Sequence, residues 1–448
     1  MKKFKILSVT LAVLILAISA VAPAGAVSFP NEVKTLSESI LLVNMDTDQV
    51  VFEKEADAKR YPASTTKIMT YIVAYEHIQN PETTRIPIKQ EVLDTLLDTG
   101  SSLANVAEHV GKTMSAIDLF YSMMVPSGND AAVVLADYVG EGSIERFVEL
   151  MNDKAKELGC NDTHFTNPDG LHDEEHYTTA RDMYKMTTYA LTLDYFEEIT
   201  NTTTYEVEGE DYPIVTTNLM IDQWRGGELY YMYAKGIKTG STDEAGRCLV
   251  TTASADGYSY MAVLLKAPYK EGEEEEYYTM TDAADLFRWS LTSLEIRTIK
   301  TIETPVCEQK VKLAWGKNSV TLVPAKNLTA VVPKDIGEEN IVVETDVPEV
   351  AEAPLNTGTK IGVATVYYRA DEKSELQELA KVDLVPSENV EMSGFLKVVD
   401  VMGTILQSYW FLVVIGIIAV IFLLYFISSK ISSRKRRKNR SVKRYRNL

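Results

Sequence analysis

One uncharged stretch near the end of the chain constrains its architecture more than any other feature. Residues 409–427 read YWFLVVIGIIAVIFLLYFI, which as an α-helix would extend roughly 28 Å, close to the thickness of the hydrocarbon core of a bilayer. The stretch is apolar on all sides, whereas a helix of a soluble core keeps a polar face. Tyr409, Trp410 and Tyr425 lie where aromatic side chains meet a membrane surface. We therefore predict a single transmembrane helix rather than a buried core helix.

The two ends of the chain predict its orientation. Residues 428–448 contain ten Lys or Arg and no acidic residue, so the positive-inside rule predicts a cytoplasmic tail. The N-terminus has three lysines, then an apolar stretch, then Ala24-Gly25-Ala26. This order is typical of a secretory signal peptide, residues 1–26, cleaved after Ala26; an uncleaved anchor helix is the alternative. Both ends place the globular part outside the cytoplasm, attached to the cell membrane.

The exported part is acidic and poor in metal-binding motifs. The chain has 64 Asp and Glu against 45 Lys and Arg, and ten of these basic residues belong to the tail. Such an excess of negative charge predicts no binding to nucleic acid. Cys160, Cys248 and Cys307 are too few and too far apart for a disulfide framework and allow at most one bridge. With no C-x-x-C and no H-E-x-x-H motif, we predict no metal and no other cofactor.

A change of composition near residue 296 predicts two exported domains. Residues 30–295 alternate helix-like and strand-like segments, including strands at 39–44 and 49–54. Residues 296–392 are rich in Val, Thr, Ile and Lys with turn residues, which predicts a small β-rich domain. Within it, the acidic, Pro-containing residues 343–358 are expected to form a long loop. Residues 393–408 would form a linker or amphipathic segment that leads to the membrane span.

The first candidate for chemistry is Ser64 in "YPASTTKIMT", with Lys67 three residues later at the start of a predicted helix. A serine at a helix start lies near free backbone N–H groups, which can stabilise an oxyanion. Residues i and i+3 share a helix face, so Lys67 can reach Ser64 and, once desolvated, act as a general base. A capped helix with a solvated lysine is the alternative, and the pair alone is weak evidence.

A polar triplet, Ser127-Gly128-Asn129, stands between two apolar helical segments and follows Pro126. Capping of the second helix by Ser127 or Asn129 is the simple interpretation. Capping does not need both side chains, however. In an acyl-transfer site the hydroxyl can relay a proton and the amide can bind a substrate carbonyl.

A third motif, Lys238-Thr239-Gly240, leads into a predicted strand. The glycine would allow close approach of a ligand, and the cation and hydroxyl can bind a carboxylate. An ordinary turn is the alternative for this motif by itself.

The three motifs together, S-x-x-K, S-x-N and K-T-G in this order in an exported chain, are the signature of penicillin-binding proteins and related β-lactamases. With "NPDGLHDEEHYTTARDM", the sequence resembles the low-molecular-mass penicillin-binding proteins that are serine-type D-alanyl-D-alanine carboxypeptidases (peptidase family S11). The resemblance covers roughly residues 35–295 and continues into the β-rich domain. It implies an α/β, transpeptidase-like fold: an antiparallel sheet covered by helices, with a helical subdomain beside the cleft.

The resemblance also implies roles. Ser64 would attack a D-Ala-D-Ala peptide of the peptidoglycan stem, with Lys67 as its base and Ser127 as proton shuttle. The substrate-binding residues would be Asn129 for the donor peptide, Lys238, Thr239 and Gly240 at the carboxylate, and Ser241, whose N–H would complete an oxyanion hole with that of Ser64. β-Lactams would mimic the substrate and trap Ser64. Asn167, Gly170 and His176 would be mainly structural.

Some members of the family hold the substrate carboxylate with an arginine on the strand after the K-T-G strand. Here "MAVLLKAPYK" offers only Lys266, so this task is expected to rest on Lys238 and Thr239. A β-lactamase, a D,D-endopeptidase with the same nucleophile and a non-catalytic peptidoglycan sensor remain alternatives. A class A β-lactamase would need a carboxylate for deacylation, for which Asp173, Glu174 and Glu175 are the candidates.

Overall fold

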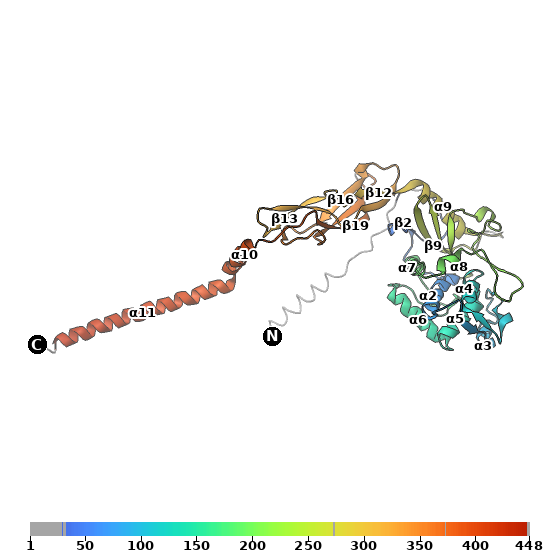
Figure 1. The fold of residues 1–448 in the computed structure, drawn as a ribbon, viewed down its shortest axis with the longest axis horizontal. Helices are drawn as coiled ribbons and strands as arrows, with labels where there is room; N and C mark the ends of the chain where they lie inside the picture. The colour runs from blue at the N-terminus through green and yellow to red at the C-terminus, as the bar shows by residue number, and fades with distance from the viewer. Residues whose placement is uncertain (1–28, 30–32, 272–273, 372, 446–448) are drawn as a thin grey trace. The chain divides into compact units, whose positions relative to one another are not determined.

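A computed structural model describes residues 29, 33–271, 274–371 and 373–445, so the predicted signal peptide lies outside the described residues. The chain forms two compact units, drawn in Figure 1. The first contains the residues up to Thr298 together with Thr329–Val342 and Val366–Ala380. The second contains Ile299–Leu328, Val343–Thr365 and the residues from Lys381 onward.

An antiparallel sheet of five strands forms the centre of the first unit, in the order β2-β1-β9-β8-β7. Its strands are β1 (Ser39–Asn44), β2 (Gln49–Lys54), β7 (Ala234–Thr242), β8 (Gly246–Ala255) and β9 (Tyr258–Ala267). Both strands predicted at 39–44 and 49–54 are confirmed. Every residue of β1 is buried, because helices cover both faces of the sheet. β7 forms one edge, and this edge carries the K-T-G residues.

Helices pack on the sheet in two groups. On one side, α9 (Tyr278–Ser293) contacts β8 and β9. On the other side, α7 (Ala180–Ala190) contacts β1 and β9. Alternate strand residues such as Leu41 and Val263 form a hydrophobic core with the helices on this side. Strand residues alternate between the faces, so both faces bury apolar side chains.

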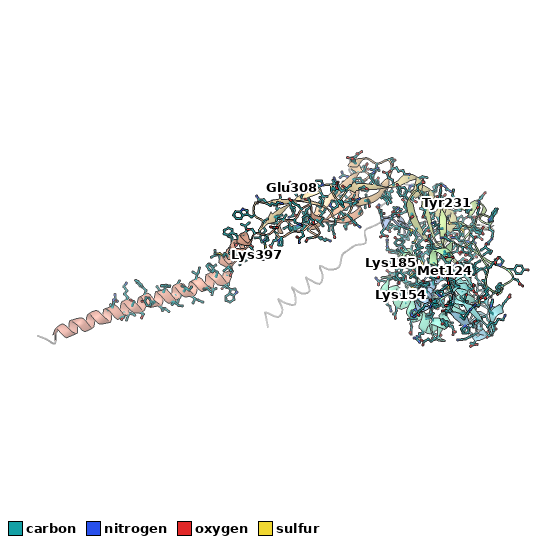
Figure 2. The ribbon with its side chains drawn as sticks, in the orientation of Figure 1. Met124, Lys154, Lys185, Tyr231, Glu308 and Lys397 are labelled. Carbon is teal, nitrogen blue, oxygen red and sulfur yellow. The ribbon has the colours of Figure 1, made fainter. Side chains whose placement is uncertain are left out.

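Helix α2 (Lys67–His77) is central to the helical part of this unit. It contacts α4 (Ala116–Met124), α5 (Asn129–Val139), α6 (Ile144–Glu157) and α7, and its residues from Lys67 to Ala74 are all buried. Met124, at the end of α4, belongs to the same hydrophobic core (Figure 2). Ser115 caps α4, because its Oγ accepts a hydrogen bond from Asp118 N at 3.1 Å. The first catalytic lysine candidate therefore lies inside a packed helix rather than on a solvated face.

The remaining elements of the first unit are short. They are α8 (Phe196–Asn201), the hairpins β3 (Arg85–Pro87) with β4 (Thr113–Ser115), β5 (Thr204–Tyr205) with β6 (Ile214–Val215), and β10 (Lys270–Glu271) with β11 (Glu274–Glu275), and the single turns α3 (Gln90–Leu93), η1 (Ala63–Thr66), η2 (Asp94–Leu96), η3 (Val106–His109) and η4 (Gly227–Leu229).

Strands dominate the chain after residue 293, which confirms the predicted all-β region. A six-stranded sheet has the order β16-β18-β19-β14-β13-β17, and β12 pairs with β15. These strands are β12 (Leu294–Lys300), β13 (Cys307–Lys312), β14 (Ser319–Pro324), β15 (Leu328–Pro333), β16 (Ile341–Asp346), β17 (Ala351–Glu352), β18 (Gly362–Tyr368) and β19 (Gln377–Pro386), with the turn η5 (Glu338–Asn340).

The prediction of a long loop at residues 343–358 is wrong in part. The segment contains the end of β16 and the short β17, which pairs in parallel with β13 through Val311 and Lys312. Lys312 Nζ also lies 2.7 Å from Glu352 Oε1. Acidic residues and proline argue against a strand, but pairing with the free edge of β13 supplies the backbone hydrogen bonds that propensity does not predict.

Two helices follow the β region. Helix α10 (Gly394–Gln407) is capped by Ser393, and α11 (Tyr409–Tyr445) contains the predicted membrane span. Within the described residues, Tyr409–Arg434 is the single segment long and apolar enough to cross a membrane, with a mean hydropathy of 3.0. All three cysteines are free, so the one bridge that the sequence allowed does not form.

Candidate active site

Ser64 does not lie in the helix that it precedes. It belongs to the 3₁₀ turn η1, and α2 begins at Lys67, so the two side chains meet where the turn passes into the helix. Lys67 Nζ donates a hydrogen bond to Ser64 Oγ at 2.9 Å. The predicted contact between the two residues is therefore present, although through a tighter turn than the α-helix expected.

Lys67 is fully buried and anchored by oxygen atoms. Besides Ser64 Oγ, its ammonium contacts Asn129 Oδ1 at 2.6 Å and the carbonyl of Asp169 at 2.7 Å. Removal from water lowers the pKa of Lys67 from 10.5 to about 8, although the charges of Asp169 and Asp130 act in the opposite direction. A lysine with this pKa is partly neutral at physiological pH and can accept the proton of a serine hydroxyl.

The simple capping interpretation of the Ser127-Gly128-Asn129 triplet is wrong. The N-cap of α5 is Gly128, and no side chain makes a capping hydrogen bond there. Instead, Asn129 accepts from Lys67, and its Nδ2 donates to Ser101 Oγ at 3.0 Å. Ser127 has a left-handed backbone, with φ of 66°, and lines the cavity that contains Ser64. Strain of this kind in a non-glycine residue is concentrated at functional sites.

Asp130, which the sequence motifs do not single out, organises the loop opposite Ser64. Its buried carboxylate accepts hydrogen bonds from the backbone N–H groups of Ala104 and Val106 at 2.9 to 3.1 Å. These bonds fix the segment that presents Ser101 and Ser102 to the cavities around Ser64. An acidic residue directly after S-x-N is too common in helix first turns to reveal this role from sequence.

The K-T-G residues lie on the edge strand β7, against the turn that carries Ser64. A Cβ atom added to Gly240 would lie 2.9 Å from Ser64 N and 2.9 Å from the carbonyl of Pro62, so only glycine allows this approach. Thr239 and Ser241 line the cavity beside Ser64, and Thr239 Oγ1 is 2.6 Å from Thr217 Oγ1.

Lys238, the lysine that the sequence predicts at the substrate carboxylate, belongs to β7. It is 1% exposed, its Nζ donates to the carbonyl of Thr239 at 3.0 Å, and it lines neither cavity at Ser64. Burial, helped by the charge of Lys67, lowers its pKa well below 10.5. Lys266, the other cation considered for a substrate carboxylate, forms an ion pair with Glu38 at 3.5 Å.

Asn167, Gly170 and His176 belong to the segment beside the site, and Gly170 lines a second cavity at Ser64. Asn167 Oδ1 accepts from Gly170 N at 2.7 Å. His176 Nδ1 accepts from Thr166 N, so its Nε2 carries the proton and donates to Thr66 Oγ1 at 2.8 Å. Burial lowers the pKa of His176 to about 3, which keeps it neutral. The contacts of Asn167 and His176 are with neighbouring protein groups, and a mainly structural role for all three residues stays a prediction.

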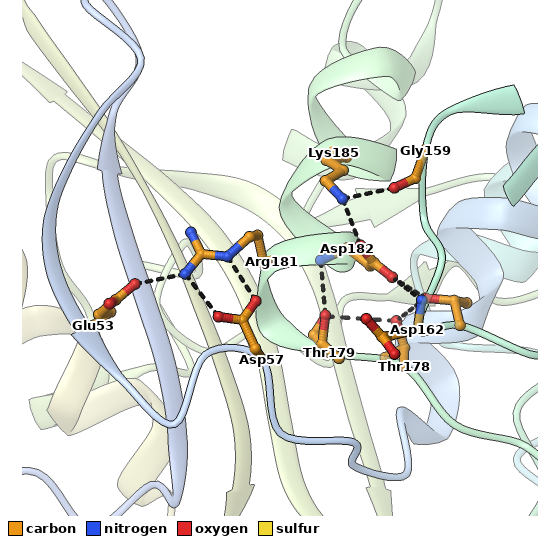
Figure 3. A network of polar contacts seen from close by, with 10 residues as sticks. Glu53, Asp57, Gly159, Asp162, Thr178, Thr179, Arg181, Asp182 and Lys185 are labelled. Carbon is orange, nitrogen blue, oxygen red and sulfur yellow. Dashed lines mark hydrogen bonds and ion pairs between the residues drawn. The ribbon is translucent and has the colours of Figure 1, made fainter. Parts of the chain in front are cut away.

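A polar network fixes the ends of the segment that carries Asp169 and Gly170 (Figure 3). Thr179 caps α7 by accepting from Asp182 N at 3.0 Å, and Asp182 in turn accepts from Asp162 N and from Lys185. Arg181 binds Asp57 and Glu53, the latter on β2, at 2.7 Å each. The carbonyl of Asp169, which accepts from Lys67, belongs to the segment between these two ends.

Replacement of Gly170 is expected to lower the free energy of unfolding. This glycine has φ of 88°, and an added Cβ would lie 2.0 Å from the carbonyl of Ala63, next to Ser64. We expect Gly170→Ala to lower the free energy of unfolding by about 2–4 kcal/mol, from backbone strain and the forced shift of η1. Gly257→Ala is the matched control, because Gly257 has φ of 84° with open space around it and should cost about 1 kcal/mol. Denaturant unfolding of both variants measures the difference; equal losses would mean that the contact with Ala63 has no effect.

A serine hydrogen-bonded to a buried lysine, a second serine and an amide around one cavity define the class of serine acyl-transfer enzymes with an S-x-x-K nucleophile. Comparison with known proteins identifies the family. Residues 26–269 match the family described as D-alanyl-D-alanine carboxypeptidase, and residues 300–392 match that described as penicillin-binding protein 5, C-terminal domain. The chain belongs to the D-alanyl-D-alanine carboxypeptidase family S11.

Relatives match over most of their length. D-alanyl-D-alanine carboxypeptidase DacC of Escherichia coli is 30% identical over 370 residues, 79% of this chain and 84% of the relative. DacF of Bacillus subtilis is 28% identical over 373 residues, 82% and 89% of the two chains. The structure of the D-alanyl-D-alanine carboxypeptidase DacD from Francisella tularensis has a TM-score of 0.63 at 26% identity and covers 83% of this chain and 98% of that one. Penicillin-binding protein 5 of Haemophilus influenzae, at 23% identity and a TM-score of 0.63, shares the fold over 82% of this chain and 100% of its own.

Proposed function

We propose that this serine-type D-alanyl-D-alanine carboxypeptidase removes the terminal D-Ala from peptidoglycan stem peptides through an acyl-enzyme on Ser64. The observation that carries the proposal is the hydrogen bond between Lys67 Nζ and Ser64 Oγ at 2.9 Å, made by a buried lysine whose pKa is lowered to about 8. A lysine of ordinary pKa would be almost fully protonated at neutral pH and could not take the serine proton.

The reaction would proceed in two stages. Ser64 Oγ attacks the carbonyl carbon of the D-Ala-D-Ala bond as its proton passes to Lys67, and the N–H groups of Ser64 and Ser241 bind the resulting oxyanion. The C–N bond then breaks, the proton returns through Ser127 to the leaving amine, and D-Ala departs. Water attacks the ester, its proton is taken by the base, and Ser64 is regenerated. Asn129 holds Lys67 and the donor peptide in register.

β-Lactams would acylate the same serine, and the enzyme would release them slowly. Asp173, Glu174 and Glu175, the carboxylates considered for a β-lactamase, are exposed, and they are not among the described residues that line the two cavities at Ser64. The acyl-enzyme with a β-lactam therefore lacks a carboxylate from that segment to activate water. This favours the carboxypeptidase over the β-lactamase.

The chain would work at the outer face of the cell membrane. We infer that residues 1–26 are removed as a signal peptide, that α11 crosses the bilayer and that the basic tail, residues 428–448, remains in the cytoplasm. A full transmembrane helix gives an effectively permanent attachment. The domains at 30–295 and 296–392 would then be extracytoplasmic, with residues 393–408 at the membrane surface.

The test is the product formed from diacetyl-L-Lys-D-Ala-D-Ala by the purified full-length protein in detergent. We expect stoichiometric release of free D-Ala and a much slower turnover of benzylpenicillin. Rapid hydrolysis of benzylpenicillin without D-Ala release would favour a β-lactamase. If the protein converts neither compound, the non-catalytic sensor is the remaining interpretation. Cleavage of cross-linked dimers in preference to the tripeptide would indicate an endopeptidase.

A further inference from the structure

Ser101, which the sequence motifs do not include, contacts the far end of the amide that binds Lys67. This amide belongs to Asn129, a residue that is 4% exposed. Its Oδ1 accepts from Lys67 Nζ at 2.6 Å, and its Nδ2 donates to Ser101 Oγ at 3.0 Å. Ser101 and Asn129 line the same cavity of about 500 Å³ as Ser64. One side-chain amide therefore connects Ser101 to the base of the proposed reaction.

The direction of these hydrogen bonds follows from the protons that the hydroxyl groups have to give. The hydroxyl of Thr99 has one proton, which it donates to the carbonyl of Leu96 at 2.7 Å. In the contact of 2.6 Å between Thr99 Oγ1 and Ser101 Oγ, the donor is therefore Ser101. Ser101 Oγ can then only accept from Asn129, so Nδ2 must face Ser101 and Oδ1 must face Lys67.

Backbone hydrogen bonds hold Ser101 in this position. Asn129 N donates to the carbonyl of Ser102 at 2.8 Å, directly after Ser101. Two residues further on, Ala104 N donates to the buried carboxylate of Asp130 at 2.9 Å. Asn129 and Asp130 thus bind the segment that carries Ser101 on its C-terminal side, and the hydroxyl of Ser101 is in place before any ligand arrives.

The orientation of the Asn129 amide decides where Lys67 can accept a proton. A neutral lysine amine has two N–H groups and one lone pair. Asn129 Oδ1 and the carbonyl of Asp169 accept hydrogen bonds but cannot donate them, so the two N–H groups of Lys67 point to these oxygens. The lone pair then faces Ser64 Oγ, 2.9 Å away, which is the group that must give up its proton.

An amide turned by 180° would have the opposite effect. Nδ2 of Asn129 would then face Lys67 and donate to its lone pair, so the base would be occupied when Ser64 needs it. An N–H donor at this place would also disfavour the charged form of Lys67, which needs acceptors. The two ends of an amide have nearly the same shape, so the hydrogen-bond partners select the orientation.

We propose that Ser101 is a positioning residue that fixes the amide of Asn129 and thereby directs the lone pair of Lys67 at Ser64. The inference rests on the proposed function, because it concerns the acylation of Ser64. Ser101 takes no proton from the substrate or the nucleophile, and its effect passes through Asn129.

The pH profile of acylation tests this role of Ser101. Stopped-flow acylation of the full-length protein in detergent by a chromogenic cephalosporin is measured between pH 5.5 and 9.5. We expect Ser101→Ala to lower the plateau rate at high pH about tenfold, because the base is aimed at Ser64 for less of the time. The midpoint of the profile should fall below the value of about 8 that Lys67 sets in the wild type, because the charged lysine loses a fixed acceptor.

A merely structural role of Ser101 would give a different profile. The rate would fall by the same factor at every pH, and the midpoint would stay where it is in the wild type. The charges of Asp130 and Asp169, which raise the pKa of Lys67, are the same in all variants. A shift of the midpoint therefore reports the hydrogen bonds of Lys67.

A matched pair of variants separates the hydroxyl of Ser101 from the shape of the loop. Ser101→Thr and Ser101→Val introduce side chains of nearly equal size, and only threonine keeps a hydroxyl. The threonine variant should retain the wild-type profile, and the valine variant should behave like Ser101→Ala; this comparison decides the matter if Ser101→Ala does not fold. Thr95→Ala is the control, because Thr95 Oγ1 donates to the carbonyl of Val92 at 2.6 Å, and its plateau and midpoint should be unchanged.

A double-mutant cycle tests whether the effect passes through Asn129. In a protein that already carries Asn129→Ala, Ser101→Ala should lower the plateau rate no further. An equal loss in both backgrounds would overturn the proposal, and so would a wild-type profile in both Ser101→Ala and Ser101→Val. Failure of the proposed function is distinguishable, because the wild type itself would then not be acylated.

Discussion

Ser64→Ala is expected to abolish D-Ala release, with kcat/KM at least about 10⁴-fold below that of the wild type. The hydroxyl of Ser64 is the group that forms the covalent bond, and Lys67, which donates to it at 2.9 Å, has no other nucleophile to activate. D-Ala release from diacetyl-L-Lys-D-Ala-D-Ala measures the loss. Because Ser64 is partly exposed and lies in a short turn, removal of one oxygen should leave the unfolding transition within about 1 kcal/mol of the wild type.

Thr65→Ala in the same turn is the control for Ser64→Ala. Its buried Oγ1 donates to the carbonyl of Pro62 at 2.7 Å and not to a site residue, so its loss should affect stability more than activity. Retention of D-Ala release in Ser64→Ala, or its loss in Thr65→Ala at unchanged stability, would assign the nucleophile to another residue.

Lys67→Met is expected to lower kcat/KM about 10³-fold and to abolish its dependence on pH. In the wild type, the neutral form of Lys67 is the base, and its pKa of about 8 means that this form increases as pH rises. The rate should therefore rise about tenfold per unit below pH 8 and become constant above it. Methionine keeps the length and the burial of the side chain, but it cannot accept a proton.

Stopped-flow acylation by a chromogenic cephalosporin between pH 5.5 and 9.5 measures this profile. Lys156→Met is a suitable control, because Lys156 is exposed and pairs with Asp153. A rate that is flat across this range, or that still rises steeply at pH 9.5, would mean that Lys67 is not a base with the lowered pKa.

The sequence predicted individual strands correctly where a single local pattern of apolar and turn residues defines them. The strands at 39–44 and 49–54 follow from apolar residues around an Asp-Thr-Asp turn. The order of the motifs predicted that Ser64, Lys67 and Asn129 belong to one site. In the structure, Lys67 forms hydrogen bonds with both Ser64 and Asn129.

The contacts that sequence reasoning missed come from segments far apart in the chain. Lys67 donates a hydrogen bond to the carbonyl of Asp169, which lies 102 residues further along the chain. A backbone carbonyl is present in every residue, so the sequence cannot identify this acceptor. The buried state of Lys238 depends on the packing of β7 against η1, which a K-T-G motif does not reveal.

The most direct test of the account is the location of the acyl group after reaction with benzylpenicillin. Trypsin cleaves after Arg60 and after Lys67, so Ser64 falls in the heptapeptide YPASTTK, where it is the one serine beside two threonines. We predict one benzylpenicilloyl group per protein in the intact mass, on this peptide, with fragment ions that assign it to Ser64. An adduct on any other residue, or an unmodified protein after prolonged incubation, would contradict the account.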